Sequence, residues 1–116
     1  MPKIAKADML DRAKEAVADR GLNYGAPENN FTRIAFRWQA HVANRYGESP
    51  HFDATDVAIM MTDVKLARLE NQPNHLDSWI DVAGYAACGA NIECDEPAKP
   101  PDDHLCECDS CVRARA

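Results

Sequence analysis

Hydrophobic residues recur at helical spacing in four separate stretches of this chain. Apolar positions three or four residues apart share one face of an α-helix, and no stretch shows the strict alternation of a half-buried strand. The pattern predicts an all-α single domain over residues 1–93, resembling a four-helix bundle, and a Pro- and Cys-rich tail over residues 94–116. The helices are expected at about residues 8–20, 30–46, 53–71 and 74–92.

Capping and turn-forming residues predict the boundaries of the first helix and the start of the second. Asp8 is a candidate N-cap for the first helix, and Gly21 is a candidate stop. The segment 21–30 is dense in Gly, Asn and Pro, so it is expected to be an ordered loop before the second helix.

The third and fourth helices each begin with a capping residue followed three positions later by an acid. Asp53 with Asp56 opens the third helix, and Asn74 with Asp77 opens the fourth. Helices joined by so short a connection pack antiparallel, so their acids can converge. A hard cation such as Mg²⁺ prefers carboxylate oxygens. The predicted Mg²⁺ ligands and catalytic residues are four aspartates: Asp53, Asp56, Asp77 and Asp81.

The same acids also have a purely structural interpretation. Asp53 and Asp77 would be capping acids, while Asp81 would pair with Arg68. Arg68 falls within the apolar arc of the third helix, so its guanidinium must find a partner or reach a ligand. Lys65, one turn earlier, is either a second cation for a phosphate or a solvated lysine. Both interpretations stay open at the level of the sequence.

Composition and charge narrow the class of partner. The chain is 46% hydrophobic and 28% charged, which is typical of a globular domain. Its formal net charge of −6 disfavours a nucleic-acid polymer, although a divalent metal can bridge an acidic site to a small phosphorylated ligand. There is no apolar run of the ~18 residues needed to span a bilayer and no signal-peptide core, so neither a membrane nor export is expected.

The tail carries a compact group of potential zinc ligands. The five cysteines of the chain are expected to be thiols or metal ligands, because an odd number leaves at least one unpaired. Free surface thiols are the alternative to a zinc site. The candidate ligands are His104, Cys106, Cys108 and Cys111.

Four motifs within residues 15–92 carry a family resemblance. They are Arg20-Gly-Leu-Asn-Tyr24-Gly, Glu28-Asn-Asn-Phe31, Asp56-Val-Ala-Ile-Met-Met61 with Lys65-Leu-Ala-Arg68, and Asp77-Ser-Trp-Ile-Asp81-Val-Ala-Gly-Tyr85. Together they resemble a group of small phage proteins linked to nucleotide modification. That group is distantly similar to the MazG-like all-α NTP pyrophosphatases.

The resemblance implies a fold and a metal site. MazG-like enzymes are four-helix, usually oligomeric proteins in which a Glu-x-x-Glu pair on one helix and a Glu-x-x-Asp pair on the next hold Mg²⁺. Asp53 and Asp56 correspond to the first pair, and Asp81 fits the last acid. Ser78 occupies the preceding Glu position, and Asp77 lies one residue too early.

The expected function is Mg²⁺-dependent hydrolysis of a nucleoside triphosphate to a monophosphate and pyrophosphate. The resemblance implies a phage protein acting in the bacterial host cytoplasm as a homo-oligomer. The alternative is a non-catalytic helical module that binds a nucleotide or a host protein, and Ser78 in place of an acid favours it. The predicted substrate-binding residues are Tyr24, Asn30, Lys65 and Arg68.

Overall fold

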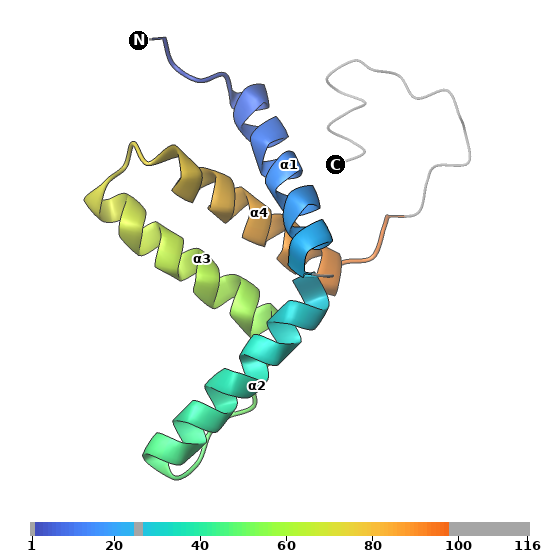
Figure 1. Cartoon of the computed structure of the whole chain (residues 1–116), viewed down its shortest axis with the longest axis vertical. Helices are drawn as coiled ribbons and strands as arrows, with labels where there is room; N and C mark the ends of the chain where they lie inside the picture. The colour runs from blue at the N-terminus through green and yellow to red at the C-terminus, as the bar shows by residue number, and fades with distance from the viewer. Residues whose placement is uncertain (1, 25–26, 98–116) are drawn as a thin grey trace.

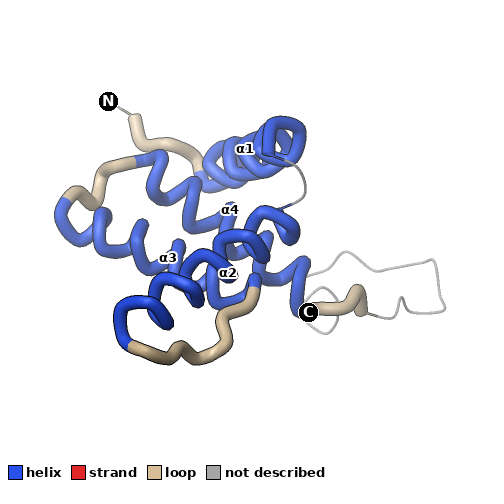
Figure 2. The backbone as a smooth tube through the Cα atoms, turned by 60° about the horizontal axis from the view of Figure 1, so that its bottom comes forward, coloured by secondary structure: helices blue, strands red, loops and turns tan. Residues whose placement is uncertain are grey.

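The computed structural model describes residues 2–24 and 27–97, with the side chains of residues 21–28 outside that description. Four α-helices account for most of this part of the chain, and it contains no strand (Figures 1 and 2). The predicted all-α architecture is thereby confirmed. The helices are α1 (Lys6–Tyr24), α2 (Pro27–Tyr46), α3 (Ala54–Asn71) and α4 (Leu76–Glu93).

The connection between α1 and α2 is shorter than the sequence predicts. Gly21 does not stop the first helix, which continues to Tyr24, and Pro27 is the first residue of α2. A glycine inside a helix costs only about 1 kcal/mol, and a proline at the first helical position is preorganised for it. The predicted loop over residues 21–30 therefore mostly belongs to the two helices.

The ends of α2 and α3 lie where the sequence places them. Gly47 follows Tyr46 with a positive φ of 89°, and its N–H donates to the Ala43 carbonyl at 2.8 Å. This left-handed backbone favours glycine, which explains why α2 stops there. Asp53 caps α3 as predicted.

The N-cap of α4 is a correction to the sequence prediction. His75, rather than Asn74, holds the cap position, and its Nδ1 accepts the Ser78 backbone N–H at 3.2 Å. Asp77 therefore lies in the first turn but outside a capping box. An imidazole nitrogen with a free lone pair can accept a backbone N–H as the side-chain oxygen of Asn or Ser usually does. Because the preferred capping residues do not include His, the sequence prediction placed the N-cap one residue too early.

α3 and α4 form an antiparallel hairpin against which the other helices pack (Figure 1). The main core cluster joins α2 to α3 and is covered by Tyr85, Cys88 and Ile92 of α4; its buried members are Phe31, Ala35, Val57 and Ala58. α1 lies against α4, where a Cβ added to Gly84 would come within 3.5 Å of Val17. The absence of a side chain at Gly84 thus permits a close contact between α1 and α4.

None of the helices in the described part of the chain is long and apolar enough to cross a bilayer.

Candidate functional site

The first turn of α4 is fixed by a pair of polar side chains. Ser78 is fully buried, and its hydroxyl lies 2.8 Å from His75 Nδ1, the same nitrogen that accepts the Ser78 backbone N–H. Since that nitrogen must accept, the hydroxyl is the donor. This arrangement fixes the rotation of α4 at its start, and with it the direction of Asp81 one turn further along.

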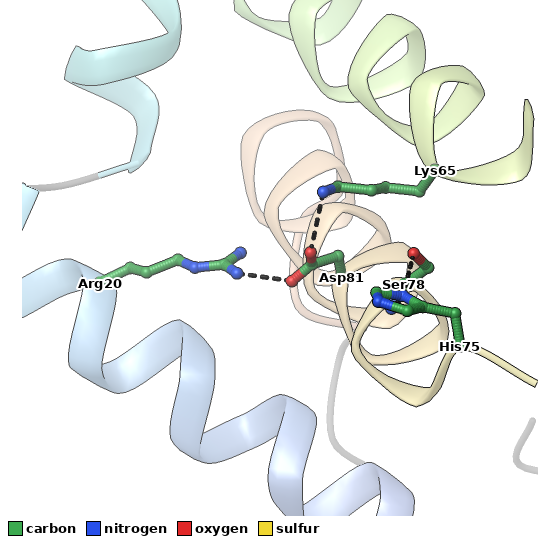
Figure 3. Close-up of polar contacts among 5 residues, drawn as sticks. All are labelled: Arg20, Lys65, His75, Ser78 and Asp81. Atoms are coloured by element: carbon green, nitrogen blue, oxygen red, sulfur yellow. Dashed lines mark hydrogen bonds and ion pairs between the residues drawn. The ribbon is translucent and has the colours of Figure 1, made fainter. Parts of the chain in front are cut away.

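Asp81 is the centre of a cluster built from three helices (Figure 3). Arg20 of α1 donates from Nη2 to Asp81 Oδ1 at 2.5 Å, and Lys65 Nζ of α3 lies 3.1 Å from Oδ2. The Asp81 and Lys65 side chains are only 13% and 21% exposed, whereas Arg20 is 43% exposed. We call these three residues the Asp81 cluster.

The electrostatics of the cluster keep Asp81 ionised. Burial by itself raises the pKa of this carboxyl, but the hydrogen bonds from Arg20 and Lys65 outweigh it, and the net pKa is lowered. The pKa of Arg20 is raised, chiefly because its guanidinium donates to Asp81. Burial raises the pKa of the Cys88 thiol, against a smaller opposite effect of Arg20. The cluster carries two cations around one anion.

An open groove runs between α1 and α4 beside this cluster. Its volume is about 960 Å³, and among the described residues that line it only Ala16 and Ile80 are uncharged. Four carboxylates face two guanidiniums, so the lining has a net negative charge. The charged lining residues are Arg12, Glu15, Asp19, Arg20, Asp77 and Asp81.

The four aspartates predicted to hold Mg²⁺ lie at two separate places. The Thr55 hydroxyl donates to Glu93, so the start of α3 lies beside the end of α4. Asp81 is twelve residues before Glu93, which corresponds to roughly 18 Å along the helix. In the described part of the chain, no three His, Cys, Asp or Glu residues are grouped closely enough to hold a metal. The antiparallel register is the reason that the acids do not converge.

Asp53 and Asp56 bond to each other's backbone at the start of α3, and capping is the structural interpretation predicted for Asp53. Asp53 Oδ1 accepts the Asp56 backbone N–H at 3.0 Å, and Asp56 Oδ2 accepts the Asp53 backbone N–H at 2.9 Å. This reciprocal pair is a capping box at the start of α3. Directly across from Asp81, the residue that α3 supplies is Lys65.

The orientation predicted for Arg68 is wrong, and so is its pairing with Asp81. Arg68 is exposed, and the partners of Asp81 are Arg20 and Lys65. Leu69 in the last turn of α3 is buried, whereas Val64, which lies four residues before Arg68 on the same face, is 56% exposed. The buried face of α3 is therefore rotated away from the face that carries Arg68, and apolar residues on several sides of the helix did not reveal this rotation.

The remaining predicted residues are less informative. Asn30 is half-buried in the first turn of α2. The Tyr24 side chain and the four candidate zinc ligands, His104, Cys106, Cys108 and Cys111, lie outside the part of the chain that the structure describes.

Arg20 is the member of the cluster that sequence reasoning missed as a site residue. It follows Ala13 and Val17 at a helical spacing of seven and three residues, on the face of α1 that packs against α4. A cation on the apolar face of a helix is a signal that could have identified it, because such a group needs a partner.

Comparison with known proteins supplies a family but no activity. A family model described as a domain of unknown function, DUF6378, matches residues 8–93. The chain is 33% identical over 85 residues to the Gene 55 protein of Mycobacterium phage D29, covering 72% of this chain and 52% of that protein. It is also 33% identical over 94 residues to the Gene 55 protein of Mycobacterium phage L5, covering 80% of this chain and 57% of that one.

The chain therefore spans little more than half the length of the curated relatives it matches. No solved structure matches it. The agreement with phage proteins bears out the phage part of the resemblance, and the match over most of the four-helix region shows that this chain belongs to the DUF6378 family of domains of unknown function.

Proposed function

We propose that this protein binds a nucleoside triphosphate as its Mg²⁺ complex in the groove between α1 and α4 and hydrolyses it to a monophosphate and pyrophosphate. The observation that carries the proposal is the Asp81 cluster, in which three helices fix two cations around a carboxylate. Arg20 and Asp81 of this cluster line the charged groove, and Lys65 contacts Asp81 from α3. Such a concentration of oriented charge is typical of sites for charged ligands.

The charge of the groove favours a metal complex over a bare phosphate. A groove with more carboxylates than guanidiniums repels a free triphosphate, whereas Mg²⁺ neutralises part of that charge. Proteins usually hold Mg²⁺ through one or two carboxylates, with water and substrate phosphate as the other ligands. A group of three acids is therefore unnecessary for this type of site.

Asp77 and Asp81 are the acids that fit such a site. Both line the groove, one helical turn apart on α4. Asp77 is exposed and makes no hydrogen bond or ion pair with any other described residue, so its oxygens are available for a metal. Asp53 and Asp56 are not part of this proposal, because they cap α3 at the far end of the hairpin.

The reaction follows from the expected product. A water molecule attacks the α-phosphorus, the bond from that phosphorus to the bridging oxygen breaks, and pyrophosphate leaves. When bound, Mg²⁺ would neutralise part of the negative charge on the triphosphate. Arg20 and Lys65 would orient the phosphate oxygens, with Asp81 holding both cations in place.

The test measures pyrophosphate release from a panel of canonical and modified nucleoside triphosphates, with and without Mg²⁺. We expect Mg²⁺-dependent release that falls by orders of magnitude in Asp77→Asn, while stability stays unchanged because Asp77 is exposed. The exposed Asp11→Asn on α1, which does not line the groove, is the matched control. Lys65→Met should weaken nucleotide binding, and Arg68→Met should not. Absence of release with every nucleotide would reject hydrolysis.

A non-catalytic module that binds a nucleotide or a host protein is the second candidate. It is favoured by Ser78, which is fully buried at the position where the similar enzymes carry an acid, and by the two cations that already occupy both oxygens of Asp81. Calorimetric titration separates the candidates: nucleotide binding without pyrophosphate release indicates the module. A Lys65→Met variant that binds as tightly as the parent protein would exclude the Asp81 cluster in either case.

A further inference from the structure

The hydrophobic core of this chain is small for the number of large apolar side chains it carries. In the described part, seven hydrophobic residues are buried and three of them are alanines. Nine large hydrophobic side chains are exposed, and four of those lie on α3: Ile59, Met60, Val64 and Leu66. Several exposed apolar side chains on one helix are typical of a surface that another protein covers.

Acidic residues accompany the exposed apolar residues of α3. Asp63 lies three residues after Met60 and four after Ile59, and Glu70 lies four after Leu66, so the acids and the apolar side chains occupy one outward face. Neither Asp63 nor Glu70 makes an ion pair with a described residue. We call this surface the acidic face of α3.

The outward surface of α2 has the opposite charge. Phe36 is 66% exposed; Arg33 lies one turn before it, and Arg37 follows it directly in the sequence, one turn after Arg33. Both arginines are exposed and form no ion pair with any residue that the structure describes. Aromatic residues and arginine are both enriched at protein interfaces. We call this surface the basic face of α2.

We propose that two copies of this chain associate by packing the basic face of α2 of one copy against the acidic face of α3 of the other. Contacts between two α2 faces would oppose arginines, and contacts between two α3 faces would oppose carboxylates, so like charges disfavour both. Only the crossed arrangement pairs opposite charges around apolar residues. When both crossed contacts form at once, the dimer has the twofold symmetry that is commonest among oligomers.

This inference does not depend on the proposed function, because the groove between α1 and α4 contains none of these residues. It names the surfaces through which a homo-oligomer would form. Phe36 would fit among Ile59, Met60 and Val64 of the other copy, while Arg33 and Arg37 would meet Asp63 and Glu70.

Charge reversal tests both the association and the pairing. Sedimentation velocity of the full chain should give about twice the monomer mass of 12.9 kDa. The double variants Arg33→Glu/Arg37→Glu and Asp63→Lys/Glu70→Lys should each be monomeric when alone. An equimolar mixture of the two should recover the dimer, because one crossed contact then keeps the native charge pairing and the other pairs the reversed charges. The helical circular dichroism of each variant should match the parent protein, because all four positions are exposed.

Three results would overturn the proposal. The parent protein could remain monomeric at high micromolar concentration, in which case these faces serve a different partner. Either double variant could remain dimeric, which would place the interface elsewhere. Two monomeric variants could fail to associate when mixed, which would show that the faces do not pair with each other.

Discussion

The start of α3 and the second turn of α4 use the same residue type for different purposes. Asp53 and Asp56 satisfy backbone N–H groups at a helix end, where water reaches them. Asp81 lies inside a helix, mostly buried, where no backbone donor is available and two side-chain cations take that place. The difference shows that an aspartate's role is set by its position relative to the helix end and to neighbouring helices.

The largest loss of stability is expected from placing a carboxylate where neither a backbone N–H nor a side-chain cation is available to it. Ser78→Glu would put a charge at a fully buried position whose present partner is His75. An unpaired buried charge should lower the free energy of unfolding by about 3–5 kcal/mol, measured by urea denaturation. Asp77→Glu, on the exposed neighbouring position, is the control and should change it little. A Ser78→Glu variant as stable as the parent would contradict the packing described for the start of α4.

A smaller loss is expected when Asp81 loses its charge. Asp81→Asn leaves Arg20 and Lys65 without a counter-ion, and because Arg20 is partly exposed the loss should be about 2 kcal/mol, below that of a fully buried pair. The exposed Asp11→Asn on α1 is the matched control.

The difference in stability between the parent protein and Asp81→Asn should depend on pH with a definite sign. The pKa of Asp81 is lowered in the folded protein, so its contribution is fully present above the unfolded value of about 3.9 and is lost as pH falls through the folded value. The stability gap between the parent protein and Asp81→Asn should therefore be constant near neutrality and shrink below about pH 4. A gap that grew in acid would exclude the ion pairs as its source.

The smallest of the three losses in stability is expected from a change in the capping box of α3. Asp53→Ala removes the acceptor for the Asp56 N–H and should lower the free energy of unfolding by about 1 kcal/mol. Asp53→Asn, which retains a capping oxygen, should recover most of it. Mg²⁺ titration of Asp53→Ala should match the parent protein. A loss of Mg²⁺ affinity in this variant would mean that Asp53 is a ligand after all.

Helix type and most helix boundaries could be predicted from the sequence because they depend on local chemistry. The apolar spacing along each helix, Asp53 as a cap and the stop at Gly47 all act within a few residues of themselves. The exceptions, Gly21 inside α1 and His75 as the cap of α4, are cases in which a weak local preference was overridden or an unusual cap was used.

The candidate site could be predicted only in part. Asp81 and Lys65 were identified on adjacent helices, but their contact depends on the register of the α3–α4 hairpin, which no spacing within one helix specifies. Arg20 is 61 residues from Asp81 along the chain, so its contribution depends on how α1 packs across Gly84. The prediction for Arg68 failed for the same reason, because the packing of the neighbouring helices determines which face of α3 is buried.

The sequence by itself determined that this chain forms four amphipathic helices, where they begin and end within a few residues, and which acids cap α3. Those properties follow from hydrogen bonds and side-chain spacing inside one helical turn. Only the tertiary structure decided which carboxylate is buried between two cations and which predicted ligands lie at opposite ends of a hairpin. The physical reason is that helix register and coverage arise from packing between elements distant in sequence, where each contact depends on all the others.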